Sequence, residues 1–382
     1  MQSPPLSLYI HIPWCVQKCP YCDFNSHGLK QDIPEDEYIS HLLADLEEEA
    51  KLVGDREVKS LFFGGGTPSL FSAAGIQRIL QGVRQRVNVS QQAEITLEAN
   101  PGTVEAGKFL GFKQAGVNRI SVGVQSFQAH HLLILGRIHD PHQAIEAIKQ
   151  ANQIGLNSFN IDLMHGLPKQ NAHLALDDLQ QAIALNAPHI SWYQLTIEPN
   201  TLFHSKPPLL PEDEMLWDIQ EAGQALLQEA GYQQYEISGY SKPEHRCQHN
   251  LNYWRFGDYI GIGCGAHGKI TQASHGSIQR RVKVKHPKGY MDTKKAYLDQ
   301  AWLVEADDLP FEFFMNQFRL FEACPKERLA AHTGLNSTTP VIQQGLQKAI
   351  DAGWLAETHT HWETTELGKR FLNELLTLFL DC

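Results

Sequence analysis

Long apolar runs are missing from this sequence of 382 residues. Nowhere do 18 consecutive apolar residues occur, so we expect no integral membrane segment. The first residues also lack the basic and apolar segments of a signal peptide, which favours a cytoplasmic protein. Basic charge is scarce, because 32 Lys and Arg stand against 43 Asp and Glu, a formal net charge of −11. Nucleic-acid binding needs a positively charged surface, so we expect no nucleic-acid partner.

Internal repeats, low-complexity tracts and an even set of cysteines are missing too. The seven cysteines are an odd number, and cytoplasmic thiols stay reduced, so a disulfide framework is excluded. Clustered thiols in that compartment more often bind a metal.

Strands and helices are expected to alternate through the first two hundred residues. Short apolar or β-branched runs typical of strands are Leu8–Ile12, Val58–Phe63, Glu94–Leu97, Arg119–Val124, Phe159–Leu163 and Ile190–Leu195. Helical patterns between them include Ala74–Val87, Val104–Ala115, Pro141–Ile154 and His173–Leu185. This alternation predicts an α/β fold with a parallel sheet, namely a partial (β/α)6 TIM-like barrel with functional groups at the C-terminal strand ends.

Three regions are expected along the chain. Residues 1–230 form the barrel core, 231–305 an irregular extension rich in Gly, His and aromatics, and 306–382 a small winged-helix-like α+β domain. In the last region we expect helices at Phe311–Cys324 and Leu367–Leu380 and a two-stranded wing at Leu355–Thr364.

A basic cluster from Arg280 to Lys288 stands out in this acidic chain. One hypothesis is an exposed edge strand protected by its charges. The other is a docking patch for an acidic partner or for the carboxylates of a ligand.

Three cysteines follow the first expected strand at the spacing C-x3-C-x2-C: Cys15, Cys19 and Cys22. Three thiolates on one loop can bind three irons of a [4Fe–4S] cluster, whereas most clusters have four protein thiolates. The remaining iron would keep an open position, which is typical of catalytic metal sites. Such an iron can chelate the amino and carboxylate groups of S-adenosylmethionine (SAM). The alternative is a structural zinc site, which would need a fourth ligand such as His11 or His27.

Glycines and polar residues end the later strands. The Gly64-Gly65-Gly66-Thr67 turn would let a ligand approach the backbone closely. Glu98, Gln125 and Asp162 lie at successive strand ends, and Arg137 follows in a loop. Each alone could merely cap a helix, but together they would lie on one face of the barrel.

These motifs resemble the oxygen-independent coproporphyrinogen III oxidase family of radical SAM proteins. The run from Tyr9 to Phe24 carries the resemblance, which extends over essentially the whole chain. The resemblance implies a [4Fe–4S] cluster on the three cysteines, and a SAM site formed by Tyr9, Gly65, Gly66, Thr67, Glu98, Gln125, Arg137 and Asp162. Arg137 would pair with a carboxylate, which suits its bidentate fork.

Within that family the chain is similar to the HemW branch, the heme chaperones. The oxidases carry a further cysteine where this chain has Phe24, and a longer stretch before the cluster. The H-N-x-x-Y-W pattern resembles the heme-binding motif of the chaperone branch, with His249, Asn250, Tyr253 and Trp254 at its defined positions. Histidine is a common axial ligand of heme iron, and aromatics can pack on a porphyrin. The alternative for His249 is a buried, hydrogen-bonded histidine.

We therefore expect a heme chaperone that carries a [4Fe–4S] cluster and SAM, binds heme and transfers it to acceptor proteins, for example respiratory ones. The first alternative is an oxygen-independent coproporphyrinogen III oxidase, a radical SAM oxidative decarboxylase. The second is a zinc-bound scaffold without redox chemistry. Whether the protein is an enzyme stays open, and so does a homodimer.

Overall fold

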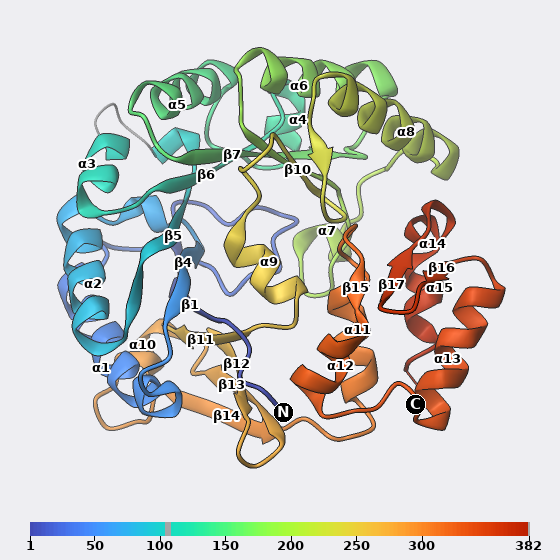
Figure 1. The fold of residues 1–382 in the computed structure, drawn as a ribbon. Coiled ribbons are helices and arrows are strands. Elements are labelled where there is room, and N and C mark those ends of the chain that lie inside the picture. Colours follow the sequence, from blue (N-terminus) through green and yellow to red (C-terminus); the bar gives the residue numbers. More distant parts are fainter. Residues whose placement is uncertain (104–107, 381–382) are drawn as a thin grey trace.

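A twelve-stranded sheet dominates the computed structural model, which describes residues 1–103 and 108–380 (Figure 1). Its strand order is β14-β13-β12-β11-β1-β4-β5-β6-β7-β8-β10-β9. Six of these strands are the six that the sequence predicts: β1 Leu6–Ile12, β4 Val58–Gly65, β5 Val89–Ala99, β6 Arg119–Gln125, β7 Ser158–His165 and β8 His189–Gln194. All six run parallel. The expected α/β fold with a partial barrel is confirmed.

Helices cover the outer side of the curved sheet (Figure 1). The helices in this part of the chain are α1 Glu35–Val53, η1 Pro68–Leu70, α2 Ala73–Arg86, η2 Pro101–Thr103, α3 Lys108–Ala115, α4 Ala129–Ile134, α5 Pro141–Gln153, α6 Ala172–Ala184, α7 Leu202–Ser205 and α8 Asp213–Glu229, of which α7 lies on the inner side of the sheet (Figure 1). Local signals set their starts: Asp140 and Gln143 form a capping box on α5, with Pro141 in its first turn. The expected start of a helix at Val104 lies outside the described residues. None of the described helices combines the length and apolar character needed to cross a membrane.

Residues 231–305 hold more regular structure than the irregular extension that the sequence indicates. Their elements are β9 Gln233–Gln234, β10 Gly239–Ser241, α9 Gln248–Trp254, β11 Asp258–Ile262, β12 His267–Gln272, β13 Ser277–Lys283, α10 Pro287–Tyr290 and β14 Leu298–Leu303. Strand β11 pairs in parallel with β1, so the chain returns to the first strand and adds a seventh parallel strand beside it. This pairing joins distant segments, and a local pattern does not reveal it.

Both hypotheses for the basic cluster are wrong for its central residues. Strand β13 is not an edge strand, because β14 pairs with it. The Lys283 side chain is only 1% exposed and its Nζ lies 2.5 Å from Asp45 Oδ1 and 2.6 Å from Glu49 Oε1. Arg281 also pairs with Glu49. These positive charges are neutralised inside the protein by carboxylates of α1, a helix more than two hundred residues away in sequence.

The C-terminal region has its own hydrophobic core, which includes Phe313, Phe314 and Trp362. Its elements are α11 Leu309–Gln317, β15 Cys324–Pro325, α12 Lys326–Thr333, α13 Pro340–Asp351, β16 Leu355–Glu357, β17 His361–Thr364, α14 Glu366–Arg370 and α15 Leu372–Thr377. The predicted wing is present as β16 and β17. The helix predicted over Phe311–Cys324 ends at Gln317, because the chain then turns into β15, which pairs with β17. The last predicted helix is divided at Phe371, whose backbone is not helical.

Candidate functional site

The loop with the three cysteines lies at the mouth of the barrel, which we define as the side where the parallel strands end. The short strands β2 Trp14–Cys15 and β3 His27–Gly28 pair with each other and clamp the two ends of the loop. Cys15 is buried at 8% exposure, whereas Cys19 and Cys22 are half-buried, and all three are free thiols. Burial raises the pKa of Cys15 and Cys22. The fold thus brings the three predicted ligands together on one clamped loop.

The glycine turn after β4 supports this loop. Gly66 N–H donates to Ile12 O and Thr67 N–H to Trp14 O, both at 2.7 Å. A Cβ atom at Gly66 would lie 2.5 Å from Trp14 O, and one at Gly65, whose φ is +113°, would collide with the His11 ring. Glycine is therefore required here by the neighbouring backbone of the cysteine loop, in addition to any ligand that approaches the turn.

A polar set lines the interior of the barrel next to the turn. Glu98 Oε2 accepts from Gly65 N–H at 3.3 Å, and Asp162 accepts from Ser121 Oγ at 3.2 Å and from Asn160 Nδ2 at 2.7 Å. Burial, with the charge of Asp162 as a second cause, raises the pKa of Glu98 to about 8. A buried acid with such a pKa can hold a proton near neutral pH.

Gln125 has a left-handed backbone with φ 71°, at the point where the register between β6 and β7 shifts. Its Oε1 accepts from Tyr193 Oη at 2.8 Å. A strained backbone at a non-glycine residue is typical of ligand sites. No sequence motif indicates Tyr193 as a site residue, although its position near the end of β8 is a signal that points to it.

Arg137 connects the cysteine loop to the barrel. Its Nη1 lies 3.5 Å from Cys19 Sγ and its Nη2 donates to Gly123 O at 2.5 Å. Its Nε is buried and has no partner. An unpaired donor on a guanidinium fits an anionic ligand group at this place.

Tyr9 lies on β1 and acts on the loop through His11. Tyr9 O–H donates to His11 Nδ1 at 3.1 Å, and His11 Nε2–H donates to Asn25 O at 2.9 Å. Because a carbonyl only accepts, the proton of His11 lies on Nε2. Burial lowers the pKa of His11 to about 4, so the ring is neutral. His11 therefore holds the cysteine loop in place through its hydrogen bond to Asn25 O, a role that only its contacts reveal.

The donor set fits the two groups that the sequence predicts here. Three thiols on one loop suit a cubane, in which each cysteine binds a different iron. Among the residues that the structure describes, no three His, Cys, Asp or Glu side chains are grouped to hold a single metal ion. The unpaired Arg137 Nε suits the carboxylate of SAM, and the carboxyl oxygens of Glu98 and Asp162 suit its hydrogen-bond donors.

The predicted heme motif lies at the opposite end of the barrel. Helix α9 sits within the curve of the sheet (Figure 1). His249 is 1% exposed, its Nδ1 lies 3.0 Å from Ser60 Oγ near the start of β4, and its Nε2 lies 3.2 Å from Tyr253 Oη. The ring stacks on Phe62 with 5.0 Å between centroids. This geometry agrees with the buried, hydrogen-bonded alternative, because neither ring nitrogen is free.

The other motif residues lie around the same helix. Asn250 is half-buried, and Trp254 packs against Arg319, whose guanidinium carbon lies 4.4 Å from the ring centroid. Trp254 Nε1 is buried without a partner. The N-terminal face of such barrels usually serves stability rather than chemistry.

A hydrogen-bonded chain crosses the barrel interior between the two ends. Asp162 is bonded to Asn160, whose Oδ1 lies 2.6 Å from His189 Nδ1, and His189 Nε2 lies 2.8 Å from Tyr235 Oη. Tyr235 Oη in turn accepts from the N–H of Cys247, the residue before α9, at 3.2 Å. Polar residues thus fill the barrel from the mouth to the helix that closes it.

Comparison with known proteins identifies the family to which this chain belongs. Residues 9–181 match the model of the radical SAM superfamily, and residues 304–371 match that of the HemN C-terminal domain. The chain is 60% identical over 380 residues to the heme chaperone HemW of Escherichia coli (strain K12), covering 100% of this chain and 99% of that protein. It belongs to the HemW family of radical SAM proteins.

Further relatives agree with this assignment. The heme chaperone HemW of Haemophilus influenzae is 56% identical over 381 residues, which cover 99% of this chain and 98% of that protein. The structure of the Escherichia coli coproporphyrinogen III oxidase HemN, a radical SAM enzyme, superimposes with a TM-score of 0.83 at 23% identity, covering 99% of this chain and 90% of that one. The HemW fold is therefore that of HemN, and the resemblance read from the motifs is confirmed.

Proposed function

We propose that this HemW family member is a heme chaperone, which binds heme and passes it to acceptor proteins. The observation that carries the proposal is its 60% identity, along the whole chain, to a protein named a heme chaperone. Phe24, which is 59% exposed on the cysteine loop, occupies the position where the oxidases are expected to carry a further cysteine.

The cysteine loop is proposed to hold a [4Fe–4S] cluster through Cys15, Cys19 and Cys22. The polar set at the mouth would bind SAM: Tyr9, Gly65, Gly66, Thr67, Glu98, Gln125, Arg137 and Asp162. When bound, such a cluster can deliver an electron to SAM. In this arrangement Arg137 orients a carboxylate beside Cys19, since its Nη1 already lies 3.5 Å from that sulfur. Glu98 holds or releases a proton at the carboxyl group that faces Gly65.

The H-N-x-x-Y-W motif remains the proposed heme contact, through His249, Asn250, Tyr253 and Trp254, with one structural condition. Both nitrogens of His249 are engaged by Ser60 and Tyr253. Heme iron could bind that ring only after Ser60 or Tyr253 releases its nitrogen and the buried ring becomes accessible. Binding through His249 should therefore be slow and limited by opening, whereas binding elsewhere should not depend on this helix.

The three regions and the compartment complete the proposal. A separate core for the C-terminal elements and the family match over residues 304–371 support a boundary near residue 306. A cytoplasmic location is proposed because three cluster thiols require a reducing compartment.

The decisive experiment starts from protein reconstituted anaerobically with iron and sulfide. Heme is titrated and followed by its visible spectrum, and apomyoglobin is then added as a model acceptor. Stoichiometric heme binding followed by transfer supports the chaperone. Conversion of coproporphyrinogen with turnover and SAM consumption would instead identify an oxidase. Zinc at unit occupancy without iron or sulfide would identify the scaffold.

The same titration with two variants tests the motif. Tyr253→Phe removes one bond to His249 and His249→Ala removes the proposed ligand. If His249 binds heme, the first variant binds heme faster and the second loses binding. Unchanged heme affinity in a folded His249→Ala protein would exclude this ligand.

A further inference from the structure

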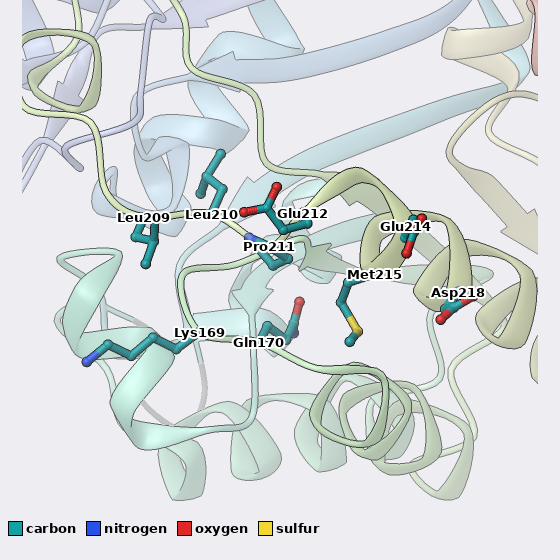
Figure 2. A pocket seen from close by; sticks show the side chains of 9 residues that line it. All are labelled: Lys169, Gln170, Leu209, Leu210, Pro211, Glu212, Glu214, Met215 and Asp218. Atoms are coloured by element: carbon teal, nitrogen blue, oxygen red, sulfur yellow. The ribbon is translucent and has the colours of Figure 1, made fainter.

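A cavity of about 440 Å³ lies near the mouth of the barrel, and none of the proposed cluster or SAM residues lines it. Figure 2 shows the side chains that do. The cavity is open to solvent and is bordered by the turn that follows β7, by the loop over residues 206–211 and by the first turns of α8. One lining residue, Leu210, also packs in a small apolar cluster with Tyr21 of the cysteine loop and Phe203 of α7. The cavity is thus connected with the mouth through packed side chains.

One side of the cavity is apolar and rigid. Leu209, Leu210 and Pro211 form it together with Met215, and Leu209 is 81% exposed. Pro207 and Pro208 precede this leucine, so the loop has little backbone freedom to lose when a partner binds. The thioether of Met215 adapts to partners of different shape. This wall suits an apolar side chain.

The other side is acidic. Glu212, Glu214 and Asp218 are exposed, and none forms an ion pair within the part of the chain that the structure describes. Lys169 is the one basic residue among those that line the cavity (Figure 2). Three unpaired carboxylates around an apolar wall favour a positively charged partner and disfavour the propionates of heme.

A buried amide at the cavity adds a third requirement. Gln170 is 3% exposed, and its Oε1 accepts from Leu167 N–H at 3.1 Å. Its Nε2 is buried and has no partner. A buried donor without an acceptor is costly, and a peptide carbonyl in the cavity would supply the acceptor.

We propose that this cavity docks a short extended segment of the heme acceptor, with an apolar side chain flanked by Lys or Arg. The apolar side chain would pack on the apolar wall, and the flanking basic side chains would pair with the carboxylates. Gln170 would donate a hydrogen bond to a main-chain carbonyl of the segment. The identity of the partner as a heme acceptor rests on the proposed function, whereas the chemistry of the segment rests on the cavity alone.

The test uses the full-length protein with ¹³C-methyl methionine, because five methionines give a simple spectrum. Met215→Leu assigns the Met215 signal. The probe is a capped Gly-Arg-Leu-Arg-Gly peptide, and its charge-inverted control is Gly-Glu-Leu-Glu-Gly. We expect the basic peptide to shift the Met215 signal to saturation and the acidic one to leave it unchanged. No shift, or equal shifts with both peptides, overturns the proposal.

Variants locate the contact. Glu214→Gln and Asp218→Asn should each lower the affinity for the basic peptide by about threefold, which is the size of contribution that an exposed ion pair makes. Leu209→Ser should lower this affinity further. Glu229→Gln, an exposed acid at the far end of the same helix, is the matched control and should change nothing. Peptide affinity that these variants leave intact contradicts the assignment.

The same spectra distinguish two other occupants of the cavity, namely a second copy of the chain and heme. A Met215 signal that moves with protein concentration alone would indicate a second copy of the chain, and one that moves with stoichiometric heme would indicate a heme site. Either result overturns the docking proposal. Heme binding measured in the same samples reports separately on the chaperone function, so the two proposals fail independently.

Discussion

At the scale of single residues, Glu98 carries a carboxyl group that burial keeps protonated near neutral pH. The group lies between Gly65 and the barrel interior, where water cannot stabilise its charge. In the unfolded chain the same carboxyl ionises at its ordinary pKa of about 4.3. Between these two values the folded protein binds one proton more than the unfolded chain.

This difference in bound protons makes the stability of the protein depend on pH. Stability falls as pH rises through this window, because deprotonation is easier in the unfolded state. The Glu98→Gln variant keeps an acceptor for Gly65 N–H but cannot titrate. Compared with this variant, the native protein should lose on the order of 3 kcal/mol of its free energy of unfolding between about pH 5 and about pH 9. Urea unfolding followed by circular dichroism measures both proteins. An equal difference at the two pH values would contradict the assignment.

Gly66 gives the second prediction at this scale. A methyl group there would meet Trp14 O at 2.5 Å and push the cysteine loop away. Gly66→Ala should therefore bind less than half of the iron and sulfide of the native protein after anaerobic reconstitution. Gly28 lies at the end of the same loop, and a Cβ atom there meets nothing within 4 Å. Gly28→Ala is the control and should bind normally; the same loss in both variants would mean that the turn is not the cause.

At the scale of elements, α9 closes the N-terminal end of the barrel through His249. His249→Ala removes two hydrogen bonds and a stacked ring from a buried position. We expect the free energy of unfolding to fall by about 3 kcal/mol, which chemical denaturation can measure. His275 is exposed, so His275→Ala should change stability by less than about 0.5 kcal/mol. A loss of heme binding in His249→Ala identifies a heme ligand only if the stability measurement shows that this variant is still folded.

Strand β13 and helix α1 are joined by a buried ion pair network. Lys283→Met leaves Asp45 and Glu49 buried without their shared ammonium group. Breaking a buried pair in this way should cost about 3–5 kcal/mol in the free energy of unfolding. Lys285→Met, two residues further and exposed, should cost almost nothing. Similar values for the two variants in urea unfolding would show that the network does not stabilise the fold.

At the scale of the whole molecule, Phe256 connects the barrel to the C-terminal domain. It lies between α9 and β11, is 1% exposed, and packs on Phe313 with 5.5 Å between ring centroids. It thus belongs to the core of a domain that follows it in sequence.

Phe256→Ala should lower stability by about 3–5 kcal/mol and divide thermal unfolding into two transitions, because the ring that anchors the segment between α9 and β11 in the C-terminal core is gone. Calorimetry would record the division. Phe24→Ala changes an exposed aromatic and is the control. A single transition in Phe256→Ala at lower temperature would mean that other contacts couple the two parts.

The sequence by itself determined the six strands, the cysteine loop and the glycine turn, because each is written in a short, local pattern of residue types. It also contained the motif around His249 and indicated the polar strand ends, whereas Tyr193 and the role of His11 in holding the cysteine loop emerge only from their contacts. Tertiary structure alone decided that the His249 motif closes the opposite end of the barrel and that β11 pairs with β1. It also decided that Lys283 is neutralised by α1. These outcomes depend on contacts between segments far apart in the chain. The free energy of such contacts comes from burial and pairing in three dimensions, and they leave no periodic pattern in the sequence.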